Sequence, residues 1–204
     1  MKIALIGATG NIGSRVLTEA LSRGHHVTAI VRNPEKVPAR PGVTAKAGDA
    51  HDPAALAPLL AGHDAVVSAV HFLASDFSKL LAAVRQSGVK RWLMVGGAGS
   101  LEVAPGLKLI DAPGFPEIYR AEAAKGGEFL EALKAQAADL DWSFLSPSAM
   151  IVPGERTGKF RLGKDTLLSD AKGDSRISME DYAIALIDEL ESPKHIRQRF
   201  TVGY

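Results

Sequence analysis

Three glycines near the start of the chain, Gly7, Gly10 and Gly13, have the spacing of a turn that can hold a phosphate group. A short apolar run ends at Gly7, and apolar residues recur at helical spacing from Val16 to Leu21, so the order is strand, tight turn, helix. The first glycine permits the sharp bend, the second lets the backbone approach a pyrophosphate, and the third lets the helix pack closely on the strand. The helix also presents unpaired N–H groups and the positive end of its dipole. The pattern therefore predicts a nucleotide-binding turn.

The type of nucleotide depends on the residue that follows the second strand, which we expect at His26–Val31. An acidic side chain at this point binds the ribose 2′-hydroxyl of NAD(H), whereas an arginine accommodates the 2′-phosphate of NADP(H). Here Arg32 and Asn33 follow the strand, and the first acid is Glu35. We therefore expect NADPH to be preferred over NADH. The alternative is that Arg32 is a solvated loop residue.

Strands and helices must alternate to bring such a turn to the edge of a sheet, and the rest of the sequence shows this alternation. It indicates one α/β domain over residues 1–204, with a Rossmann-like, doubly wound parallel sheet. Residues 147–178 and 197–204 are expected to form a small C-terminal subregion on the substrate side, with a hairpin within 156–169. Ser178 and Asp181 predict a capping box at the start of the last helix. Further strands are expected at 43–46, 64–70, 91–95, 142–145 and 199–202, and a long helix at 117–138.

The composition excludes several other classes of protein. Lys and Arg number 24 and Asp and Glu 23, so the net charge of +1 offers no basic surface for nucleic acid. Because the chain has no cysteine, it has no disulfide, no thiolate nucleophile and no zinc–cysteine site, and we expect no metal site. No apolar run approaches the length of a membrane span, and the apolar start breaks at Gly7, unlike a signal peptide. We expect a cytoplasmic monomer or homodimer that acts on a small molecule.

The residue identities within these motifs resemble those of known families. The segment Gly7–Gly13, which reads Gly-Ala-Thr-Gly-Asn-Ile-Gly, resembles the atypical and extended short-chain dehydrogenase/reductases, including NmrA-like proteins. Over essentially its whole length the chain resembles bacterial NADH-flavin reductases and is similar to mammalian flavin reductase/biliverdin reductase B. The motifs that carry this second resemblance are Val31–Pro34, Gly48-Asp49, Val95–Ser100, Phe115–Tyr119, Ser146–Ser148, Pro153–Gly158 and Arg176–Ser178.

The glycine motif and the resemblance together imply a set of cofactor-binding residues. Asp49 would lie beside the adenine, or would simply be a turn aspartate. The ends of the fourth and sixth strands would border the nicotinamide, close to His71, which is a candidate proton donor or a surface histidine. The predicted cofactor-binding residues are Gly7, Thr9, Gly10, Asn11, Ile12, Gly13, Arg32, Asn33, Asp49, Ala50, Ser68, Ala69, Val70, Gly97, Ser146, Pro147 and Ser148.

The catalytic residues of ordinary short-chain dehydrogenases are missing from this chain. Those enzymes use a serine after strand five and a Tyr-x-x-x-Lys on the next helix, where the lysine lowers the pKa of the tyrosine that protonates the substrate. Here Gly96–Ala98 occupies the place of the serine, and Ala123 stands four residues after Tyr119. The candidate catalytic residues are Ser100, the nearest hydroxyl, and Tyr119, for which a packing role is the alternative.

The missing pair favours an acceptor that needs little acid catalysis. Hydride transfer to a flavin spreads charge over the ring system, so the protein has mainly to position two rings. We therefore predict NAD(P)H-dependent reduction of flavin, quinone or a similar conjugated acceptor, under a lid formed by residues 101–116. The alternative from a different class is an NADP(H)-binding sensor without turnover, as in NmrA-like regulators. An epimerase or dehydratase of sugar nucleotides is a third interpretation, against which the short C-terminal part argues.

Overall fold

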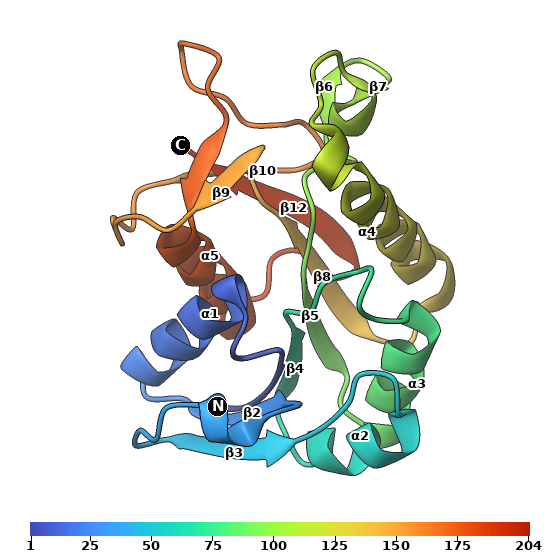
Figure 1. Ribbon diagram of the computed structural model, residues 1–204, viewed down its shortest axis with the longest axis vertical. Helices are drawn as coiled ribbons and strands as arrows, with labels where there is room; N and C mark the ends of the chain where they lie inside the picture. The colour runs from blue at the N-terminus through green and yellow to red at the C-terminus, as the bar shows by residue number, and fades with distance from the viewer.

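An eight-stranded sheet forms the centre of the computed structural model, which describes residues 1–204 (Figure 1). The strands lie in the order β10-β12-β8-β5-β4-β1-β2-β3, and every neighbouring pair is parallel except β10 and β12. The strand order reverses between β1 and β4, so the predicted doubly wound sheet is confirmed. The strands are β1 (Lys2–Ile6), β2 (His26–Val31), β3 (Val43–Ala47), β4 (Ala65–Ser68), β5 (Arg91–Val95), β8 (Asp141–Ser146), β10 (Arg161–Gly163) and β12 (Gln198–Gly203).

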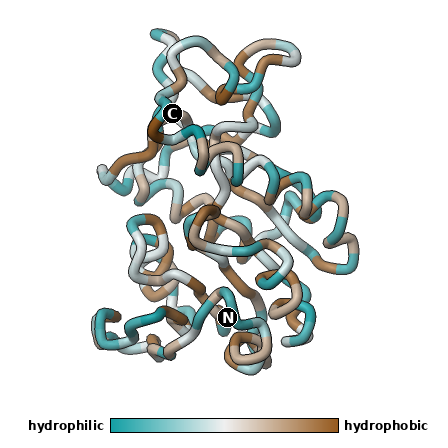
Figure 2. The backbone as a smooth tube through the Cα atoms, turned by 45° about the vertical axis from the view of Figure 1, so that its right-hand side comes forward, coloured by the Kyte–Doolittle hydropathy of each residue, from teal (hydrophilic) through white to brown (hydrophobic).

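Helices cover both faces of the sheet, α1 and α5 on one face and α2, α3 and α4 on the other (Figure 1). Successive side chains of a strand point to opposite faces, so the buried strands supply apolar residues to two cores, one under each helix layer. In Figure 2 the hydrophobic stretches run mostly through the middle of the molecule, and much of the outer loops is hydrophilic. The helices are α1 (Asn11–Ser22), α2 (Pro53–Leu60), α3 (Phe77–Ser87), α4 (Glu117–Gln136) and α5 (Met179–Glu191).

The strand boundaries follow the apolar runs closely. β2 and β5 span the predicted residues, and β3, β8 and β12 differ from prediction by one residue at one or both ends. β4 is shorter than the predicted 64–70 and ends at Ser68. The reason is that the chain turns after this residue: the Ala69 amide still donates to the Ile6 carbonyl at 2.9 Å, but Val70 lies against the glycine turn.

The connection between β5 and α4, predicted as a lid, contains secondary structure of its own. A short hairpin of β6 (Glu102–Ala104) and β7 (Leu107–Lys108) is followed by the 3₁₀ turn η2 (Leu109–Asp111). A second 3₁₀ turn, η1 (Pro34–Lys36), follows β2. The connection is therefore a defined substructure.

The prediction of a hairpin within 156–169 is wrong. One strand forms there, β10, and it pairs antiparallel with β12, joining Leu162 to Val202. The following segment turns to the β6–β7 hairpin instead: the Glu102 amide donates to the Asp165 carbonyl at 2.8 Å, and Leu167 donates to the Glu102 carbonyl at 2.9 Å. Because the exposed edge of β12 offers unpaired backbone groups, it captures β10.

The rest of the C-terminal part forms a two-stranded parallel sheet of β9 (Met150–Val152) and β11 (Arg176–Ser178). Ser178 caps α5 as predicted, because its hydroxyl accepts from the Asp181 amide at 3.0 Å. The Asp181 carboxylate does not complete a capping box. It is fully buried and accepts hydrogen bonds from Thr157, from the Gly158 amide and from the Tyr204 hydroxyl. A tertiary contact therefore takes the place of the predicted local one. The substrate-side role of this subregion stays a prediction.

Candidate cofactor-binding and active site

The glycine turn leaves no room for side chains at its first and third glycines. Gly7 has a φ of +87°, and a Cβ there would lie 2.4 Å from the Ala69 carbonyl oxygen. A Cβ at Gly13 would lie 2.1 Å from the Gly7 carbonyl oxygen, so only glycine allows α1 to pack this closely on the turn. A Cβ at Gly10 would meet the same oxygen at 3.4 Å. The turn and the end of β4 therefore lie in direct contact.

The start of α1 is left open for an anion. The α2, α3 and α5 helices begin with a side chain that accepts from the first turn, whereas Gly10 caps α1 without one and the first turn carries no acid. The first hydrogen bond runs from the Ser14 amide to the Gly10 carbonyl at 2.9 Å. The preceding amides, of Asn11, Ile12 and Gly13, have no partner within the chain. With Thr9 and Asn11 exposed beside them, these groups fit a pyrophosphate.

The residues predicted to contact the adenosine half lie at the ends of β2 and β3. The Gly48 amide donates to the Val31 carbonyl at 3.0 Å, which places Arg32 and Asp49 at one edge of the sheet. Arg32 and Asn33 are exposed, and Arg32 has no ion pair. The Asp49 carboxylate accepts from the His51 amide at 2.9 Å, as in an ordinary Asx turn, and its second oxygen is free. The half-buried Ala50 packs against the core beside α2.

The residues predicted to contact the nicotinamide half differ in what their side chains do. Ala69 and Val70 line the glycine turn, and Gly97 lies beside Phe72. The three serines are buried and already engaged. The Ser68 hydroxyl accepts from Trp92 at 2.9 Å, and the Ser148 hydroxyl donates to the Val202 carbonyl at 2.9 Å.

Ser146 is the third of these serines. Its hydroxyl accepts a long hydrogen bond of 3.5 Å from Arg199. The adjoining Pro147 is buried. The side chains of Ser68, Ser146 and Ser148 are thus engaged within the protein, so that any contact of these residues with a cofactor would be made by their backbone.

The structure does not bring the two candidate catalytic residues into contact. The Tyr119 side chain is 63% exposed and its hydroxyl has no partner, whereas Ser100 is half-buried and accepts from Arg199 at 3.2 Å. A Cβ on Gly99 would lie 2.8 Å from the Cβ of Ala123. The loop after β5 therefore occupies the place of a Tyr-x-x-x-Lys lysine. Lys125 forms an exposed ion pair with Glu128 instead.

Tyr182, on α5, is not a second candidate for the catalytic acid. It is fully buried under the end of β5, where it donates to the Leu145 carbonyl at 2.6 Å and accepts from the Gly96 amide at 3.3 Å. Burial raises the pKa of this phenol far above its usual range. With its hydroxyl buried and bonded to the Leu145 carbonyl, Tyr182 supports the sheet and does not face an acceptor site.

Two residues near the site have no signal in the sequence. Glu122, on α4, accepts from the amides of Phe72 at 2.7 Å and Leu73 at 3.0 Å, and so holds the loop after β4. The same carboxylate approaches His71 at 3.3 Å, but the His71 side chain is 86% exposed, which matches the surface-histidine alternative. Arg199, on β12, reaches both Ser100 and Ser146. Only tertiary contacts distinguish Glu122 and Arg199 from ordinary surface and strand residues.

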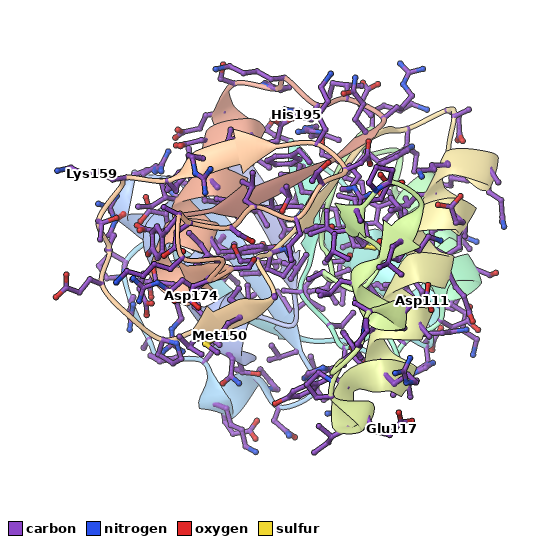
Figure 3. The ribbon with its side chains drawn as sticks, turned by 90° about the horizontal axis from the view of Figure 1, so that it is seen from above. Asp111, Glu117, Met150, Lys159, Asp174 and His195 are labelled. Carbon is purple, nitrogen blue, oxygen red and sulfur yellow. The ribbon has the colours of Figure 1, made fainter.

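The elements that carry the predicted site residues meet at one edge of the sheet. In Figure 3, Met150 on β9 and Glu117 at the start of α4 lie toward the same side of the molecule, and His195 lies toward the opposite side. Met150 and Glu117 follow the carboxyl ends of β8 and β5, whereas His195 precedes β12. Ligands of doubly wound sheets bind at the carboxyl edge. No helix in the structure combines the length and the apolarity needed to cross a membrane.

Comparison with known proteins agrees with this geometry. The chain matches the model of an NAD(P)H-binding family over residues 7–193. Among solved structures, a candidate exported protein from Burkholderia pseudomallei is 49% identical, with a TM-score of 0.90 and full coverage of both chains. A candidate epimerase from Bacteroides thetaiotaomicron is 45% identical, with a TM-score of 0.94, over 100% of this chain and 96% of that one. A candidate NADH-flavin reductase from Streptococcus pneumoniae is 34% identical, with a TM-score of 0.81, over 100% of this chain and 99% of that one.

The names of these three relatives differ, so the similarity establishes a family and a cofactor class but not one reaction. The name of the Burkholderia protein also leaves the cytoplasmic location as a prediction. The family match spans the glycine turn, the open start of α1 and every strand of the central sheet except β1 and β12. The chain therefore belongs to the NAD(P)H-binding family.

Proposed function

We propose that this protein is an NADPH-dependent reductase of flavin or of a similar flat, conjugated acceptor. The observation that carries the proposal is the open start of α1 behind a glycine turn that admits no side chain at Gly7 or Gly13. Gly10–Ile12 hold the pyrophosphate there. Arg32, exposed and without an ion pair, takes the 2′-phosphate, which makes NADPH the preferred form.

The type of acceptor follows from what the site lacks. Tyr119 is exposed without a partner, and the loop at Gly99 fills the space of the missing lysine, so no strong acid is built into the site. When bound, the reduced nicotinamide supplies a hydride, and the acceptor gains that hydride and a proton from water while the cofactor leaves oxidised. The chain's own part is to position the acceptor, with Phe115 and Tyr119 lining its pocket and the β6–β7 hairpin limiting access of water.

A cofactor-binding sensor is the second candidate, and the same missing Tyr-x-x-x-Lys pair favours it. A sensor needs the glycine turn and Arg32 but no acceptor site. The two candidates therefore predict equal cofactor binding and differ in turnover.

Oxidation of NADPH, followed by its absorbance with a panel of flavins and quinones, separates them. The reductase requires tighter binding of NADPH than of NADH and turnover with at least one conjugated acceptor. Tight NADPH binding without turnover by any acceptor supports the sensor. Failure to bind either cofactor contradicts both candidates.

A further inference from the structure

Arg199, on β12, makes buried polar contacts near the carboxyl edge of the sheet. Its side chain is 5% exposed, which is rare for a charged group without a special partner. On one side the guanidinium pairs with Asp165, through Nε at 2.8 Å and Nη2 at 2.7 Å. On the other side Nη1 donates to the Ser100 hydroxyl at 3.2 Å and approaches the Ser146 hydroxyl at 3.5 Å. One cation thus joins a candidate catalytic serine to the end of β8.

The hydrogen atom of the Ser100 hydroxyl has no acceptor within the chain. Its oxygen accepts from Arg199, and it donates to no acceptor in the chain. The residue is half-buried, so that it contacts both the protein and the space outside. A hydroxyl that accepts a charge-assisted hydrogen bond becomes a better donor, because the two bonds polarise each other.

The position of Ser100 is fixed by the surrounding backbone. It stands at the base of the β6–β7 hairpin, where the Leu109 amide donates to the Leu101 carbonyl at 2.8 Å and the Ile110 amide donates to the Gly99 carbonyl at 3.0 Å. Arg199 Nη2 also contacts the Ser100 carbonyl at 3.5 Å. A donor held in this way is preorganised and does not have to reorient during a reaction.

We propose that Arg199 is a positioning residue that polarises Ser100, and that this pair stabilises the negative charge that develops on the acceptor. The inference rests on the proposed reductase function and narrows its substrate class. The acceptor must carry a carbonyl oxygen or an imine-type ring nitrogen, conjugated to the atom that receives the hydride. The Ser100 hydroxyl donates a hydrogen bond to that oxygen or nitrogen and keeps its proton, and the proton of the product comes from water. The pair takes the place of the absent tyrosine and lysine, with the cation supplied from β12.

A double-mutant cycle tests whether Arg199 acts through Ser100. Ser100→Ala and Arg199→Met are each expected to lower kcat about 10-fold to 100-fold, the range of a charge-assisted hydrogen bond. The double variant should be no slower than the slower single variant. Arg199→Lys, which keeps a shorter cation, should recover part of the rate. If Arg199 only supports the fold, the losses of the two single variants multiply in the double variant, and this result would overturn the proposal.

Arg91 provides the matched control. It is a buried arginine of the same sheet, with a side chain 11% exposed, and it pairs with Glu189 at 3.1 Å near the amino edge. Arg91→Met should destabilise the protein at least as much as Arg199→Met does, but the folded fraction should turn over at the parent rate. An equal loss of kcat in the Arg91 variant would mean that the Arg199 effect is structural.

A binding measurement makes the test independent of turnover. Quenching of FMN fluorescence by the protein saturated with NADP⁺ reports acceptor binding directly, and Ser100→Ala should weaken it about 10-fold. A parent that binds FMN but reduces no flavin or quinone of the panel refutes the reductase, yet weaker FMN binding by Ser100→Ala still supports a hydrogen bond from the Arg199–Ser100 pair to the acceptor. Binding that is equal in the two proteins, or absent from the parent, overturns the proposal.

Discussion

Replacement of Gly13 by alanine tests the geometry on which the cofactor site depends. The new methyl carbon would lie 2.1 Å from the Gly7 carbonyl oxygen and 3.3 Å from the Ala8 Cα. These are backbone atoms, so no side chain can rotate away, and an ordinary contact of 3.4 Å or more requires α1 to move by over 1 Å. Overpacking of this kind costs about 1–3 kcal/mol. The higher helix propensity of alanine offsets roughly 1 kcal/mol of this cost. We therefore expect a net loss of stability of about 0–2 kcal/mol, with the larger effect on cofactor binding.

The same displacement of α1 moves the amides that face the pyrophosphate. Loss of a charge-assisted contact costs about 1.5–3 kcal/mol, so the NADPH dissociation constant of Gly13→Ala should rise by roughly 10-fold to 100-fold. Stability is measured by urea unfolding followed through Trp92 and Trp142, which are both buried. Cofactor affinity is measured by titration of NADPH fluorescence.

Gly88→Ala is the control that separates crowding from backbone strain. Gly88 ends α3 with a φ of +77°, and a Cβ there would have no atom within 4 Å. The left-handed conformation costs alanine about 1–2 kcal/mol, offset by about 0.4–1 kcal/mol through the unfolded chain, so stability should fall slightly. NADPH binding should not change. If Gly13→Ala has the same free energy of unfolding and the same NADPH dissociation constant as the parent, our account of the tight turn is refuted.

Three further predictions concern cofactor choice, catalysis and acid stability. Arg32→Asp should weaken NADPH binding by about 10-fold to 100-fold and leave NADH nearly unchanged, as measured by parallel titrations; a variant that binds each cofactor as tightly as the parent does would show that Arg32 is only solvated. Tyr119→Phe should keep most of kcat, because the exposed hydroxyl has no partner, whereas a loss of about 10²-fold or more would make Tyr119 a general acid. The Arg156 guanidinium hydrogen-bonds Glu19 and lowers the pKa of this buried carboxyl below 4.5. The resulting stability is present above pH 4.5 and is lost as the pH falls through the lowered value, so in urea unfolding Arg156→Met should destabilise the protein at pH 7 and less at an acid pH below that lowered value. An equal loss at both pH values would contradict this reasoning.

Local patterns in the sequence determine most of the fold and one half of the site. β2 and β5 begin and end at the predicted residues, because a strand buried on both faces is an apolar run that a turn must interrupt. Gly7, Gly10 and Gly13 predict the turn, since Gly7 and Gly13 each meet a steric requirement that arises within the first 13 residues or at the neighbouring end of β4. The same locality explains why Ser178 was correctly predicted as the cap of α5.

Contacts between distant segments determine what the sequence left open or predicted wrongly. Asp181 binds Thr157 and Gly158 instead of closing a capping box, and β10 pairs with β12 instead of forming its own hairpin. Arg199 meets Ser100 across 99 residues, because β12 lies beside β8 and the loop after β5 folds over both. A residue pattern predicts burial and turns along the chain. It does not predict the partner of an arginine on a strand, because that partner depends on the order of the strands in the sheet. The glycine turn that we propose as the phosphate-binding end could therefore be predicted from the sequence, and the polar environment at the proposed acceptor end appears only in the tertiary structure.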